Sequence, residues 1–184
     1  MKYDRIYISG QDVPRAALPV FQHLVDTYAS ETNKTASVWQ MFTASDLVWR
    51  PHLRSSTVEE IMRHQLLSER RFFGEFLGSP EPAAAEVLPV QQTIDGFTLR
   101  LLELASARLQ WLSAMSEAEW LQATNFFDVQ RERVWVFWRR VLHSAHHRTQ
   151  LTVYLRLLNR SVPPTYGPTA DVTWSGADPT LTVR

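Results

Sequence analysis

Three of the six histidines lie in one short segment, and their spacing is suited to binding a metal ion. His143 and His147 are four residues apart, so on a helix both imidazoles project from one face and can reach a single ion. His146 lies about 100° around the helix from His147. Its spacing of three residues from His143 keeps it open as a substitute ligand, ranked below His147. Histidines that simply fill a core or a surface are the competing interpretation, because such pairs also arise by chance.

A pair of histidines needs a third ligand, and three other histidines are available: His23, His52 and His64. His64 lies in the middle of a predicted helix among apolar neighbours, which favours a position facing the core. His52 follows a proline in a predicted loop, and the neighbours of His23 do not single it out. The predicted metal site is therefore His64, His143 and His147.

The ligand types define the chemistry that such a site supports. The chain has no cysteine, so thiolate ligands and cysteine nucleophiles are excluded. Three neutral imidazoles suit zinc or nickel best, with iron or manganese as alternatives, and leave a coordination position for water or a substrate thiolate. Glu60, one turn before His64, is the best candidate for a general base, although a carboxylate in a first helical turn more often stabilises the helix end. Arg148 and Gln150 are expected to form hydrogen bonds around the site or between helices.

Four predicted helices must position these residues. Apolar side chains recur every three or four residues over about 13–42, 58–77, 91–115 and 134–159. In the first of these helices, Pro14 and Pro19 are best tolerated in a first turn and could delay its start. Ser30, Thr32 and Asn33 leave a kink or break open. Residues 123–133 suit an extended loop or a weak hairpin. Together these segments predict an all-α, four-helix bundle, in which facing side chains commonly build metal sites.

We expect a single domain over residues 1–184, with its core at about 13–159 and an extended, proline-rich tail at 160–184 packed along the bundle. Nineteen basic residues balance nineteen acidic ones, so the composition gives no support to binding of nucleic acid or of an anionic membrane. We find no signal-peptide pattern and no apolar run of about 18 residues, which favours a cytoplasmic location.

The seven tryptophans allow three interpretations. Packing in the core is the default. Trp135 and Trp138, three residues apart on the last predicted helix, could instead line an apolar pocket for a small-molecule substrate. Exposed apolar surface on the first or last long helix could also form a homodimer interface.

Two stretches of the chain resemble the DinB/YfiT-like family of proposed metalloenzymes. The first is WRP at residues 49–51, followed by STVEEIMRH at residues 56–64. The second is HSAHHRTQL at residues 143–151, followed by the tail VPPTYGPTAD at residues 162–171. The second stretch is similar to the family's H-x-x-x-H-R-G-Q motif, except that Thr149 replaces the usual glycine.

This resemblance implies the ligand role for His64, His143 and His147, and an up-down-down-up four-helix bundle over most of the chain. Relatives include thiol-dependent transferases and metal-dependent hydrolases. The leading hypothesis is therefore a metal-dependent enzyme of one of these types. The alternatives are a non-catalytic metal-binding or stress-response scaffold, and a metal-free helical interaction protein.

Overall fold

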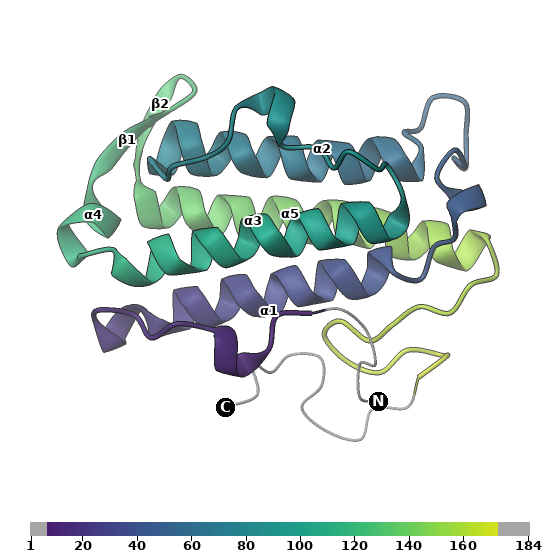
Figure 1. Cartoon of the computed structure of the whole chain (residues 1–184), viewed down its shortest axis with the longest axis horizontal. Helices are drawn as coiled ribbons and strands as arrows, with labels where there is room; N and C mark the ends of the chain where they lie inside the picture. Colours follow the sequence, from purple (N-terminus) through teal and green to yellow (C-terminus); the bar gives the residue numbers. More distant parts are fainter. Residues whose placement is uncertain (1–6, 173–184) are drawn as a thin grey trace.

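Four long helices lie side by side in the computed structural model, which describes residues 7–172 (Figure 1). They are α1 (Gln22–Trp39), α2 (Val58–Arg71), α3 (Ile94–Ala114) and α5 (Arg133–Leu157). Helix α1 packs against both α3 and α5, and α2 packs against α5. Their apolar faces enclose one hydrophobic core. The prediction of a mainly helical fold is confirmed, and the up-down-down-up order of the helices stays a prediction.

Short elements connect the long helices. The helix α4 (Glu117–Leu121) leads into β1 (Ala123–Phe126) and β2 (Val129–Glu132), which pair antiparallel. Residues 123–133 therefore form the weak hairpin that was one of the two predicted alternatives. The remaining elements are four 3₁₀ turns and one π-helical turn: Gly10–Asp12, Pro19–Phe21, Ala44–Asp46, Ala84–Glu86 and the π-helical Phe72–Leu77.

The first long helix is shorter than predicted at its beginning and has no break. It begins at Gln22, after a 3₁₀ turn that starts at Pro19, because a proline fits a first turn and cannot donate a hydrogen bond further inside a helix. The predicted start near residue 13 is therefore wrong. Asn33 does not interrupt the helix. Its side chain instead exchanges two hydrogen bonds with the backbone of Ile8, at 2.8 and 2.9 Å.

The helix that carries His64 is fixed at both ends. Thr57 caps its start: the Thr57 hydroxyl accepts from the Glu60 N–H, and the Glu60 carboxylate accepts from the Thr57 N–H. After Arg71 the predicted helix continues as the π-helical turn, which ends at Gly78 in the left-handed region with φ 84°. This register places His64 in the second turn of α2.

Residues 160–172 of the predicted tail contain no helix or strand, and they contact the helices. The Tyr166 hydroxyl donates to the Glu31 carboxylate on α1 at 2.7 Å and accepts from Arg148 on α5. Residues 173–184 of the predicted tail lie outside the described residues. None of the helices within residues 7–172 has the length and apolar character needed to cross a membrane.

Candidate metal centre

The structure brings together the three histidines that the sequence predicts as ligands. His64 comes from α2, whereas His143 and His147 come from α5 one turn apart. The ring centroids of His64 and His143 are 5.3 Å apart, and the ring of His147 lies 4.6 Å from each of the others. One ring nitrogen of each histidine lies within 4.8 Å of the other two. The cluster therefore joins two helices that are distant in sequence.

The nitrogen spacing fits a divalent ion. The Nε2 atoms of His143 and His147 are 3.3 Å apart. Two nitrogens bound to one zinc ion at 2.0–2.1 Å with a tetrahedral angle lie about 3.3 Å from each other. The donor set, three imidazoles without a carboxylate, suits zinc or nickel.

All three imidazoles have pKa values below that of free histidine. Burial lowers the pKa of His143 to about 3, with the charge of Arg140 and the two neighbouring imidazoles acting in the same direction. Partial burial also lowers the pKa of His64, again aided by Arg140. For His147, burial lowers the pKa and outweighs the opposing hydrogen bond to Gln150. The rings are therefore neutral at pH 7, which is the form that binds a metal ion.

Hydrogen bonds orient the two histidines on α5. His147 Nδ1 donates to Gln150 Oε1 at 2.8 Å, which leaves the lone pair of His147 on Nε2. The Gln150 amide in turn lies 3.3 Å from His146 Nε2. On the other side, Arg140 Nη1 lies 2.8 Å from His143 Nδ1. Because a guanidinium only donates, His143 Nδ1 accepts, and the proton of neutral His143 lies on Nε2, facing His147.

Arg140 is itself held firmly in the core. It is 2% exposed and donates to the Ser68 hydroxyl, to the Gln65 carbonyl and to the Glu69 carboxylate. Sequence reasoning missed this residue as part of the site. Its position three residues before His143, on the same face of α5, is the signal that could have identified it.

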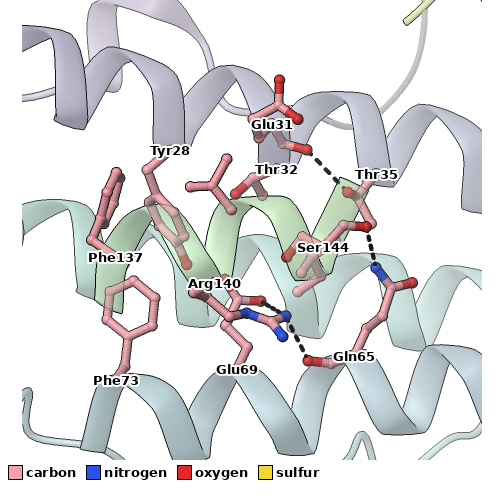
Figure 2. A pocket seen from close by; sticks show the side chains of 12 residues that line it. Tyr28, Glu31, Thr32, Thr35, Gln65, Glu69, Phe73, Phe137, Arg140 and Ser144 are labelled. Carbon is pink, nitrogen blue, oxygen red and sulfur yellow. Dashed lines mark hydrogen bonds and ion pairs between the residues drawn. The ribbon is translucent and has the colours of Figure 1, made fainter. Parts of the chain in front are cut away.

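A small cavity lies in the core beside Arg140, and Figure 2 shows the guanidinium among the residues that line it. Its polar lining includes Thr32, Gln65, Glu69 and Ser144, and none of the three clustered histidines lines it. The volume of about 20 Å³ is enough for roughly one water molecule. It is therefore too small to be a substrate pocket.

One flank of the cluster is apolar and another is open to solvent. The ring of Phe72, from the π-helical turn, stacks against His143 with centroids 5.9 Å apart. Phe72 also packs against Phe126 of the hairpin, which contacts Trp135. His64 is exposed. A molecule in solution can therefore reach the cluster from the His64 side.

The other candidate residues lie outside the cluster. His146 is exposed and is not among the three clustered histidines, although its ring lies 5.0 Å from that of His147. The His23 ring bonds the Val20 carbonyl at the start of α1, and His52 accepts from a loop N–H. Glu60 caps α2, so its structural role is confirmed and its carboxylate is not free to act as a base. Arg148 forms a buried ion pair with Glu31 of α1, which is the interhelical contact that was one of its two predicted roles.

Solved structures with a similar fold come from two Bacillus species. A DinB-like protein from Bacillus cereus has a TM-score of 0.69 and 18% identity, over 78% of this chain and 95% of that chain. A DinB-like protein from Bacillus subtilis has a TM-score of 0.62 and 18% identity, over 77% and 95% of the two chains. A search of curated proteins finds no match. The model of the DinB family matches residues 15–175, a span that includes all three clustered histidines, and the chain therefore belongs to the DinB family.

Proposed function

We propose that this protein is a metal-dependent enzyme of hydrolase or thiol-transferase type that acts on a small molecule at His64, His143 and His147. The observation that carries the proposal is the convergence of three neutral imidazoles from two helices, with a nitrogen spacing that suits one divalent ion. Membership of the DinB family is compatible with metal binding.

The residues around the cluster are compatible with the binding of an ion and with access of a small molecule. A divalent ion on three neutral ligands would activate a bound water or a substrate thiolate. Gln150 orients His147 so that its Nε2 lone pair faces the cluster, whereas Arg140 would have to release His143 Nδ1 before His143 binds an ion through Nε2. The exposed side of His64 gives access from solvent, and Phe72 offers an apolar surface next to the ligands.

The alternative is a non-catalytic scaffold in which a metal ion only ties α2 to α5. One observation favours it: within residues 7–172, the cluster contains no carboxylate, and the best candidate base, Glu60, is occupied in a helix cap. The two functions share the ligands and differ in whether a substrate or exogenous ligand can bind the ion.

The metal content of the purified protein tests the shared part of both functions. After incubation with zinc or nickel and dialysis, the parent is expected to hold close to one ion per chain, and the His64→Ala variant very little. His146→Ala is the matched control, because it removes a neighbouring imidazole outside the cluster, and it is expected to retain the ion. A parent without metal, or equal loss in both variants, would contradict the ligand assignment.

The cobalt-loaded protein separates the enzyme from the scaffold. Visible absorption of cobalt responds to a change in its ligands, so a small thiol or azide should shift the spectrum if a coordination position is open. An unchanged spectrum at saturating thiol, with cobalt still bound, would support the scaffold. A shift would justify a screen of thiol-transfer and hydrolysis reactions, with His64→Ala as the inactive control.

A further inference from the structure

The outer face of α5 carries a stripe of exposed apolar side chains. Leu142, Val153 and Leu157 are 63%, 52% and 57% exposed. Trp135 and Trp138 are 40% and 38% exposed, and each is partly covered, Trp135 by Phe126 and Trp138 by His23. At 100° per residue, all five lie within about 60° of Leu142 around the helix axis. We call these five residues the α5 stripe. Other exposed apolar residues, such as Leu53, Val90 and Leu99, lie on loops and on other helices.

The spacing of the α5 stripe is typical of helix-to-helix packing. Trp135, Trp138 and Leu142 are separated by three and four residues, and Ala145 and Thr149 continue the same series. This is the heptad spacing with which two helices interlock side chains. A surface helix that faces only water has polar residues at such positions.

A shallow, open depression lies in the middle of this face. It is lined by residues of α5 only: Leu142, Ala145, His146, Thr149, Gln150 and Val153. The smaller side chains Ala145 and Thr149 lie between the larger Leu142 and Val153. The pattern is therefore large, small, large along the helix, which is nearly the same when read in either direction.

We propose that the α5 stripe binds the α5 stripe of a second copy of this chain, with the two helices antiparallel around a two-fold axis between Ala145 and Thr149. A two-fold interface must be complementary to itself. This arrangement places Leu142 near the partner's Val153 and leaves the large side chains over the depression. The equal numbers of basic and acidic residues mean that no net charge opposes association.

The available area suits a stable dimer. The stripe runs over 22 residue steps, or about 33 Å of helix. At their exposed fractions, its five side chains leave roughly 500 Å² of apolar surface in water, if each full side chain is taken at about 150–250 Å². That value is as large as the largest apolar patch of a typical monomer. Together with the polar side chains between them, it approaches the about 800 Å² per partner of a standard interface.

Sedimentation equilibrium over a concentration series tests the association. The parent is expected to approach twice the chain mass of 21.3 kDa. Leu142→Glu should raise the dimer dissociation constant by at least about 100-fold, because the interface would bury an unpaired charge. Leu99→Glu is the matched control: Leu99 is 53% exposed on α3, and its replacement should leave the constant unchanged. A monomeric parent at every concentration, or equal effects of the two variants, would overturn the proposal.

Single cysteines test the antiparallel orientation, since the chain has none of its own. Ala145→Cys lies near the proposed axis and should cross-link to itself with a short bis-maleimide. Leu157→Cys should not, because antiparallel helices place the two copies of this residue about 30 Å apart along the helix axis. Efficient self-cross-linking at position 157, or none at position 145 in a dimeric protein, would overturn the arrangement.

Discussion

Gln150 Oε1 accepts a hydrogen bond from His147 Nδ1 at 2.8 Å, three residues further along α5. This contact fixes both the tautomer and the plane of the imidazole, so that Nε2 faces the other two histidines. Partners of this kind typically change metal affinity by 10–100-fold when they are removed.

We therefore expect Gln150→Leu to weaken zinc binding by about 10–100-fold, as measured by competition with a chelating dye. Gln150→Glu keeps an acceptor at this position and should bind more tightly than Gln150→Leu. Equal affinity of Gln150→Leu and the parent would show that the ring of His147 is held by packing alone.

Binding of an ion should move the proton of His143 from one ring nitrogen to the other. Arg140 donates to His143 Nδ1, so the proton of neutral His143 lies on Nε2, where an ion would bind. Because the pKa of His143 is lowered to about 3, the ring is already neutral at pH 7. It binds an ion after a change of tautomer, and Arg140 must turn away from Nδ1. Calorimetric titration with zinc at pH 7, in buffers of different ionisation enthalpy, is therefore expected to give close to no proton release per ion. Release of about one proton per ion would mean that the bound site carries one negative charge more than three neutral imidazoles supply.

A buried ion pair should contribute more to the fold than an exposed one. Arg108 donates two hydrogen bonds to Glu81, at 2.8 and 2.7 Å, and both side chains are buried. Arg108→Met leaves Glu81 buried without its partner, so the free energy of unfolding is expected to fall by about 3–5 kcal/mol in urea titrations.

The control for this experiment is Arg156→Met. Arg156 pairs with Asp171 at 2.6 Å, but its side chain is 51% exposed. Solvent screens such a pair, and the expected loss is below about 1 kcal/mol. Similar losses in both variants would contradict the importance that we give to burial.

The sequence was sufficient to predict the helices and the three clustered histidines, because both depend on local spacing. Apolar residues at three- and four-residue intervals indicate helices, and His143 and His147 share a face on any helix. His64 could be chosen only by its apolar neighbours and by the family resemblance.

Other features could not be predicted, because they depend on how distant segments pack. Asn33 has a sequence pattern compatible with a helix break, yet it bonds Ile8, 25 residues away. The role of Arg140 requires the positions of Ser68 and Glu69 on another helix. The exact start of α1 depends on which of two prolines the first turn accommodates.

The Glu31 carboxylate should stabilise the folded protein at neutral pH and lose this effect in acid. Glu31 accepts hydrogen bonds from Lys34, Arg148 and Tyr166. Burial tends to raise the pKa of the Glu31 carboxyl, but the charge of Arg148 and these hydrogen bonds outweigh it and hold the pKa below 4.5. A carboxylate whose pKa is lower in the folded state stabilises the fold above its unfolded pKa, and this stability is lost as the pH falls through the folded pKa.

We therefore expect the parent to be more stable than Glu31→Gln at pH 7, by a margin that stays constant down to about pH 5 and shrinks below it. Urea titrations at a series of pH values measure this margin. Glu103→Gln is the control, because Glu103 pairs with Arg100 but its side chain is 69% exposed, so solvent screening should keep its effect small at every pH. A margin that grows as the pH falls below 5 would mean that Glu31 is protonated in the folded protein, and that Tyr166 is held by Arg148 and Lys34 without its charge.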